Sequence, residues 1–163
     1  MTIDTSGLIY NRTADAAYEC TDLNRVAAFC ETVVNQARSE IQFIANLRNQ
    51  YDVAESEYSA PFPTLNAITV KKDFKVTDTY TIAQMDQYLR NANYVIDNLP
   101  PPQEKPMPEN MRFLTYDKAN NIEENLKQGA EAFANKAEQT ENNIKNTAAA
   151  FAYSGEIFAG GII

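Results

Sequence analysis

The chain has 163 residues and a formal net charge of −8, from 22 acidic and 14 basic side chains. Nucleic acids and anionic membrane surfaces attract basic proteins, so this charge disfavours both as partners. The sequence contains no histidine, which removes the commonest general base and the commonest transition-metal ligand. The length is typical of one domain, and we expect a single helical domain over residues 1–163.

Residues 1–20 are expected to form an N-terminal arm. Within it, Leu8, Ile9 and Tyr10 make a short apolar stretch that could be a strand or an anchor. The first residues lack the basic and apolar regions of a signal peptide, so we expect none. No apolar run reaches the roughly 18–20 residues of a membrane span. Cys20 and Cys30 are ten positions apart, and we expect two free thiols.

Apolar residues at spacings of three and four predict a first helix over residues 21–57. Thr21 is a suitable N-cap residue. At 1.5 Å per residue such a helix would be about 54 Å long, far longer than average. Phe29 and Phe43 widen its apolar stripe, which favours three or more packed helices over a two-stranded seam. The fold class is therefore mainly α, a long-helix bundle or coiled-coil-like rod.

Two prolines, Pro61 and Pro63, separate this helix from an extended segment. In residues 67–80, β-branched and aromatic side chains partly alternate with polar ones, which indicates a short extended or hairpin segment. A second helix is predicted over residues 81–99, because Thr81 and Gln84 have the spacing of a capping box.

Five of the seven prolines lie in residues 100–113, which predicts a stiff strap that returns the chain along a helix. A third, alanine-rich helix is predicted over residues 115–153, with Gly155 as its C-terminal cap. Residues 154–163 are then expected to form an extended tail. The apolar residues of this tail are candidate contact residues, and they are Ile157, Phe158, Ile162 and Ile163.

We expect no catalytic, cofactor-binding or metal-binding residues and no small-molecule substrate. Ser154 is not part of a nucleophile motif, and no histidine is present to activate it. Pairs of carboxylates could in principle support acid–base chemistry, but a solvated helix face is the favoured interpretation. These pairs are Glu55 with Glu57, Glu123 with Glu124, and Glu138 with Glu141.

Short sequence stretches, spread in order over nearly the whole chain, together resemble a known family. They are YNRTAD at 10–15, AYECTDLNRV at 17–26, TIAQMDQYL at 81–89, LPPP at 99–102, LTYDKANNIE at 114–123 and YSGEIFAG at 153–160. The set resembles small tail, baseplate or fibre-associated proteins of phages and prophages of Gram-positive, especially clostridial, bacteria. The chain departs from that pattern at Ala159, where the family often has a second serine, and in the alanine run before Tyr153.

The resemblance implies a non-enzymatic structural protein of a virion, made in the cytoplasm of the bacterial host. It would be a tail baseplate or fibre-junction component that forms homo-oligomers and docks onto other tail proteins. The arm residues Leu8, Ile9 and Tyr10 and the apolar tail residues would make those contacts. Two alternatives stay open: a host-facing adhesin or receptor-binding module that uses the 67–80 segment, and an unrelated intracellular helical adaptor. A small hydrolase is disfavoured, because no activated nucleophile is evident.

Overall fold

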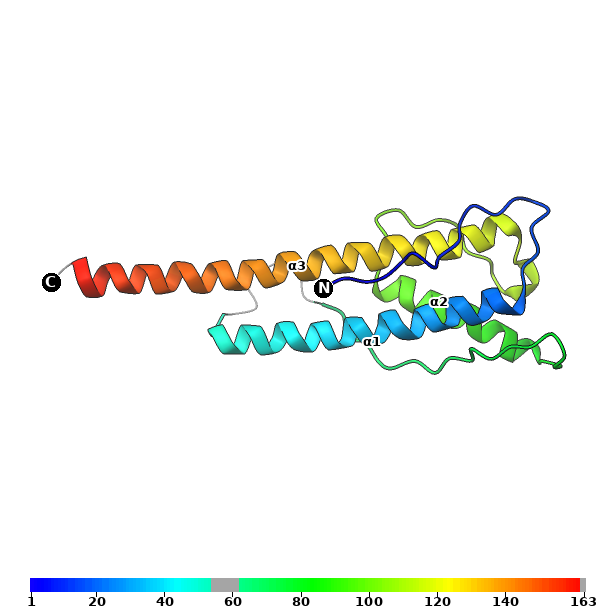
Figure 1. Ribbon diagram of the computed structural model, residues 1–163, viewed down its shortest axis with the longest axis horizontal. Helices are drawn as coiled ribbons and strands as arrows, with labels where there is room; N and C mark the ends of the chain where they lie inside the picture. The colour runs from blue at the N-terminus through cyan, green and yellow to red at the C-terminus, as the bar shows by residue number, and fades with distance from the viewer. Residues whose placement is uncertain (54–61, 162–163) are drawn as a thin grey trace.

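A computed structural model describes residues 1–53 and 62–161, with side chains described as far as residue 150. It is mainly helical (Figure 1), with α1 Cys20–Tyr51, α2 Ile82–Asn98, a short 3₁₀ helix η2 Met111–Phe113, and α3 Tyr116–Gly161. The described residues contain no β-strand. This agrees with the predicted helical bundle, whereas the described segment from 67 to 80 is not a hairpin.

The first helix begins and ends earlier than predicted. Glu19, not Thr21, is the N-cap, and its backbone N–H donates to the Asp22 carboxylate at 2.9 Å. Asp52 ends the helix in the left-handed conformation with φ 55°, and its N–H donates to the carbonyls of Arg48 and Asn49. Aspartate is among the few residues other than glycine that visit this region readily. The predicted end at residue 57 is therefore wrong, and residues 54–57 lie outside the described part.

The second helix is confirmed, because Thr81 caps it and accepts a hydrogen bond from the backbone N–H of Gln84 at 3.2 Å. The third helix starts as predicted but continues to Gly161. The extended tail is thus wrong for residues 154–161, while Ile162 and Ile163 lie outside the description. A glycine inside a helix costs only about 1 kcal/mol relative to alanine, so Gly155 does not force an end between helix-forming neighbours.

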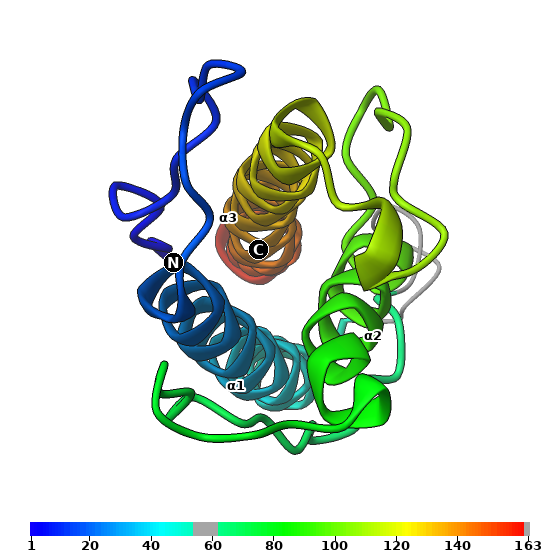
Figure 2. The same ribbon diagram turned by 90° about the vertical axis from the view of Figure 1, so that its right-hand side faces the viewer.

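All three helices run in the same direction (Figures 1 and 2). Arg25 near the start of α1 contacts Glu123 near the start of α3. Similarly, Tyr88 of α2 bonds to Tyr18, just before α1, while Leu99 after α2 lies against Gly129 farther along α3. Parallel neighbours require each connection to travel back along the bundle, which explains the long segments between the helices.

Asparagine side chains on the helices hold these returning segments. Asn24 of α1 accepts from the backbone N–H of Phe74 at 2.7 Å and donates to the Phe74 carbonyl at 2.9 Å. Asn91 of α2 donates to the carbonyl of Thr69 at 3.1 Å. A buried backbone group without a partner is costly. The helix amides therefore satisfy both backbone groups of Phe74 and the carbonyl of Thr69, which a hairpin would have paired with its second strand.

The same reciprocal contact occurs twice on α3. Asn120 bonds to both backbone groups of Arg12, each at 3.0 Å, and so holds the N-terminal arm. Asn125 is fully buried and bonds to both backbone groups of Lys105 at 3.0 and 3.1 Å. The proline-rich segment is therefore held against α3 at Lys105 and, through Asn121, at Pro106. Each long irregular segment thus has an asparagine clamp, meaning Asn24, Asn120 or Asn125.

The core lies between the three helices and is contiguous. Its fully buried members include Val26, Ile96, Ile122, Leu126 and Ile144, which come from all three helices. The end of α2 lies close against α3 at Gly129, where an added Cβ would stand 2.0 Å from the carbonyl oxygen of Leu99. No helix in the described part is long and apolar enough to span a membrane.

Candidate functional site

Four charged side chains from three parts of the chain form an ionic cluster, defined here as Arg12, Asp22, Arg25 and Glu123. Arg12 contacts Glu123 at 2.7 Å and Asp22 at 2.9 Å. Arg25 contacts Asp22 at 3.0 Å and also pairs with Glu123. The side chain of Glu123 has no exposed surface, and that of Arg12 is 6% exposed. Two positive and two negative groups compensate each other, as buried charges require.

The ionic cluster also binds the backbone of the arm. Glu123 accepts the backbone N–H of Ile9 at 2.9 Å. Arg12 donates to the carbonyl of Ile9 at 3.0 Å, and Arg25 donates to that of Gly7 at 2.8 Å. These bonds place the arm alongside α1 and α3. The carboxylate of Glu123 and the terminal nitrogens of both arginines thus bond to other parts of the same chain, so the cluster is a structural joint.

Two tyrosines, the half-buried Tyr18 and the buried Tyr88, lie beside the ionic cluster. The hydroxyl of Tyr18 donates to that of Tyr88 at 2.6 Å, which joins the arm to α2. The guanidinium of Arg12 stands 5.0 Å from the centre of the Tyr18 ring, within cation–π range. Burial raises the pKa of both tyrosines well above the usual value. Both hydroxyls therefore stay protonated at physiological pH and serve as hydrogen-bonding groups.

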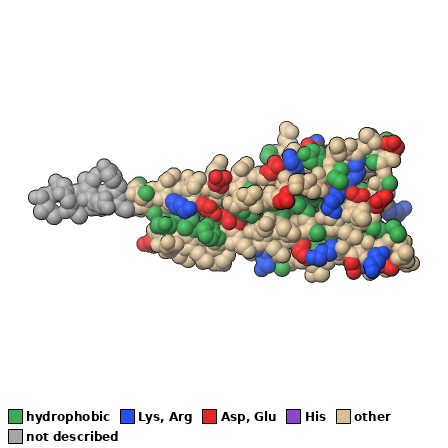
Figure 3. Space-filling view, in the orientation of Figure 1, with side chains coloured by type: hydrophobic (Ala, Val, Ile, Leu, Met, Phe, Trp, Pro, Cys, Tyr) green, Lys and Arg blue, Asp and Glu red, His purple; other side chains and the backbone are tan. Residues whose placement is uncertain are grey.

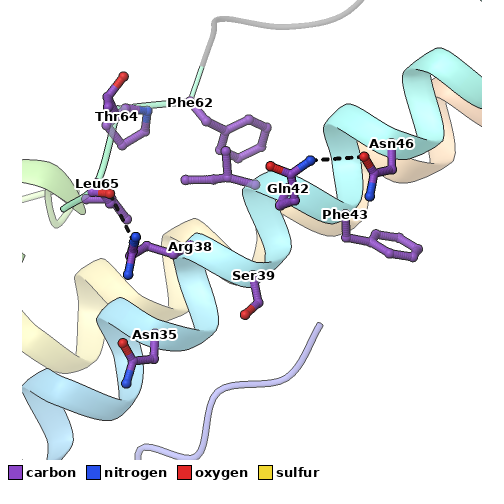
Figure 4. A pocket seen from close by; sticks show the side chains of 11 residues that line it. Asn35, Arg38, Ser39, Gln42, Phe43, Asn46, Phe62, Thr64 and Leu65 are labelled. Atoms are coloured by element: carbon purple, nitrogen blue, oxygen red, sulfur yellow. Dashed lines mark hydrogen bonds between the residues drawn. The ribbon is translucent and has the colours of Figure 1, made fainter. Parts of the chain in front are cut away.

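A groove of about 850 Å³ follows the outer side of α1 (Figure 4). Its walls are polar side chains of α1, together with Ile41 and Phe43 of the same helix, and the segment from Phe62 to Leu65. Arg38 donates to the carbonyl of Leu65 at 3.2 Å, and Gln42 donates to Asn46 at 2.9 Å. The polar groups of the lining are three amides, the hydroxyls of Ser39 and Thr64, and one guanidinium, with no carboxylate or cysteine among them. Such a groove can hydrogen-bond a passing chain through these amides, hydroxyls and the guanidinium.

The predicted contact residues of the arm have divided roles. Leu8 is 8% exposed and belongs to the core, whereas Ile9 and Tyr10 are each 39% exposed. The ammonium of Lys127 stands 5.4 Å from the centre of the Tyr10 ring. Leu8 is thus an internal anchor, and only its two neighbours are available for an external contact.

The predicted contact residues of the tail lie elsewhere. Ile157 and Phe158 are on the helical backbone of α3, far along the molecule from the arm, and not in an extended tail (Figure 1). Ile162 and Ile163 fall outside the described residues. The structure therefore does not bring the two predicted contact regions together into one surface.

The carboxylate pairs behave differently from one another. Glu123 is buried in the ionic cluster, and the solvated interpretation is wrong for it, while Glu124 is 23% exposed and pairs with Lys105. Glu138 is exposed and Glu141 is half-buried. The pair Glu55 and Glu57 lies outside the described residues. Within the described part, no three cysteine, aspartate or glutamate side chains are grouped so that they could hold a metal ion.

Sequence reasoning missed the ionic cluster. A signal was present, because Glu123 precedes the buried Ala130 and Ala137 at intervals of seven residues. A carboxylate on that line must be buried with a counter-charge, and both arginines lie in stretches that carry the family resemblance. Comparisons with protein-family models, with curated proteins and with solved structures found no match. Function is therefore inferred from the motifs of the chain and from the geometry that they produce.

Proposed function

We propose that this protein is a non-enzymatic structural component of a phage virion. It would belong to the tail baseplate or to a fibre junction, assemble as an oligomer, and dock neighbouring tail proteins. It would be made in the cytoplasm of the bacterial host and carried in the virion. The proposal begins from the ordered motifs, which resemble those of small tail-associated phage proteins.

The observation that supports this proposal is the meeting of those motifs in the ionic cluster. Arg12 comes from YNRTAD, Asp22 and Arg25 from AYECTDLNRV, and Glu123 from LTYDKANNIE. Stretches up to 111 residues apart thus depend on one another physically. Motifs whose residues contact one another in the fold are a more specific signature than the same short motifs at positions that do not touch. The joint positions an arm and contains no reactive group, which fits a structural role.

The direct test is the composition of purified particles. Particles induced from the source culture would be banded on a density gradient and labelled with a gold-conjugated antibody against this chain. Label at the tail tip or fibre root is expected, and label on the tail shaft would assign another station. Intact particles without label, with the protein free in the lysate, would refute the proposal and favour an intracellular adaptor.

A genetic test uses a matched pair of variants. A prophage that lacks this gene would be complemented with the wild type, with Glu123→Gln, or with Glu124→Gln. Disrupting the ionic cluster should lower the yield of infectious particles strongly, whereas the neighbouring surface substitution should leave the yield unchanged. Equal titres from all three would show that the joint has no part in the virion. Binding of the purified protein to host cell walls would instead support the adhesin alternative.

A further inference from the structure

This protein holds its own non-helical backbone with side-chain amides that its helices present. The three asparagine clamps, Asn24, Asn120 and Asn125, each bond to both backbone groups of one residue at 2.7–3.1 Å. A side-chain amide can do this because its oxygen accepts and its nitrogen donates, which matches the N–H and C=O of a peptide backbone. A helix that presents amides along a groove therefore has the means to hold an extended chain there.

The groove on the outer side of α1 carries three further amides. Asn35, Gln42 and Asn46 line it, and all three side chains are exposed (Figure 4). Gln42 donates to the oxygen of Asn46 at 2.9 Å, which leaves the Gln42 oxygen and the Asn46 nitrogen for a ligand. Unlike the asparagine clamps, these three amides bond to no backbone group in the described part of the chain.

Arg38 already binds a backbone group at one wall of this groove. Its Nε donates to the carbonyl of Leu65 at 3.2 Å, and this bond leaves the two terminal nitrogens of the guanidinium for a ligand. The lining from Asn35 to Asn46 follows α1 for about 16 Å. That distance corresponds to about five residues of extended chain.

Charge and apolar surface define the chain that fits the groove. Arg38 is the one charged residue of the lining, although the whole chain carries −8. A carboxylate on the occupant would therefore meet a guanidinium without a competing acidic group in the lining. Phe43 also lines the groove and is 49% exposed, and hydrophobic side chains gather over the C-terminal part of α1 (Figure 3). The groove suits a segment that combines apolar side chains with an acidic one.

We propose that this groove binds an extended polypeptide segment of another protein by its backbone, with an acidic side chain of that segment on Arg38. The inference rests on the proposed function, which includes docking of neighbouring tail proteins but names no surface for it. Asn35, Gln42 and Asn46 bond to the backbone N–H and C=O groups of the segment, as the asparagine clamps do within the chain. Phe43 covers its apolar side chains.

The probe is a displayed library of random peptides of about seven residues, long enough to span the groove. Peptides selected on the full-length protein should carry an acidic residue, and fluorescence anisotropy would give the Kd of the best one. Arg38→Gln should raise that Kd about tenfold and Gln42→Ala about threefold. Asn142→Ala removes an exposed amide of α3 outside the groove, and this matched control should leave the Kd unchanged. Circular dichroism would check that all variants retain their helices.

A methylated form of the same peptide separates backbone recognition from side-chain recognition. Methyl groups on its backbone nitrogens keep every side chain and remove the N–H donors. Because the lining amides would lose their bonds to those donors, the Kd should rise at least about tenfold. Equal binding of the methylated peptide would overturn the inference.

Three other results would also overturn it. They are a library from which no peptide is enriched, equal Kd values for the wild type, Arg38→Gln and Gln42→Ala, and a wild-type oligomer in sedimentation velocity that dissociates in Arg38→Gln. In the last case a second copy of the chain would occupy the groove. Peptide binding is measured without particles. Binding by a protein that is absent from purified virions would refute the proposed function alone, whereas labelled particles without peptide binding would refute this inference alone.

Discussion

Replacing Glu123 with glutamine should destabilise the protein and release its N-terminal arm. The substitution keeps the shape of the side chain and removes its charge. It leaves Arg12, whose side chain is 6% exposed, and Arg25, whose side chain is 27% exposed, with Asp22 as the remaining counter-ion of the ionic cluster. Breaking a buried ion pair costs about 3–5 kcal/mol. Because Asp22 still compensates one arginine, we expect a loss at the low end, about 3 kcal/mol.

Two measurements check this expectation. Urea unfolding should show the lower free energy of unfolding, which is a large part of the roughly 5–15 kcal/mol typical of a domain. Limited trypsin digestion reports on the arm, because cleavage after Arg12 requires that residue to leave the cluster. Mass spectrometry should detect the fragment 1–12 at low protease concentration in the variant and not in the wild type.

The adjacent Glu124→Gln variant is the matched control. Glu124 is 23% exposed and its partner Lys105 is 43% exposed, so the change should stay within about 1 kcal/mol. The reasoning would be refuted if Glu123→Gln also stayed within that limit and its Arg12 site resisted trypsin. The arm would then be held by Leu8 and by Asn120, and the ionic cluster would contribute little.

Three further outcomes are expected. Asn125→Ala should lower the free energy of unfolding by about 2–4 kcal/mol, because both backbone groups of Lys105 lose their partner. A loss below about 1 kcal/mol in urea unfolding would show that Asn125 does not clamp the segment. Gly129→Ala should destabilise the folded protein by about 1–3 kcal/mol, because the new Cβ would meet the Leu99 carbonyl. This loss should outweigh alanine's better helix propensity. A higher melting temperature than that of the wild type would show that α2 and α3 can move apart there. Burial and the nearby Glu141 raise the pKa of Glu40 to about 7. The folded state then holds that proton more tightly than the unfolded state, so the stability that Glu40 contributes is full below pH 4.5 and is lost as pH rises from 4.5 to 7. Urea midpoints at pH 5.5 and 8 should differ less in Glu40→Gln than in the wild type, and equal differences would assign the pH effect to other groups.

Local patterns predicted the helices well, because local chemistry determines them. Thr81 and Gln84 sit at the spacing of a capping box, and that box forms. The end of α1 was harder to place, because the spacing of apolar residues does not indicate that Asp52 adopts a left-handed conformation. The end of α3 was misplaced for a related reason: Gly155 permits a left-handed cap but does not require one.

The contacts between segments could not be predicted in the same way. In a helical sequence Asn24 and Asn125 look like weak helix formers on a solvated face. Their role depends on backbone groups 50 and 20 residues away. Glu123 and Arg12 are separated by an even longer stretch. The residues that flank each of them in the sequence therefore do not identify its counter-ion. Polar residues on an otherwise buried line are the available signal, and they indicate burial without naming the partner.

The common direction of the three helices also gives the molecule a large electric dipole. Peptide units of about 3.5 D add head to tail in each helix, and the helices have 32, 17 and 46 residues. Parallel helices reinforce one another, so the helical backbone contributes roughly 300 D along the long axis. In antiparallel bundles most of this moment cancels. Two copies lying side by side therefore attract when they point in opposite directions and repel when they are aligned. An aligned ring of copies would need further contacts to hold it.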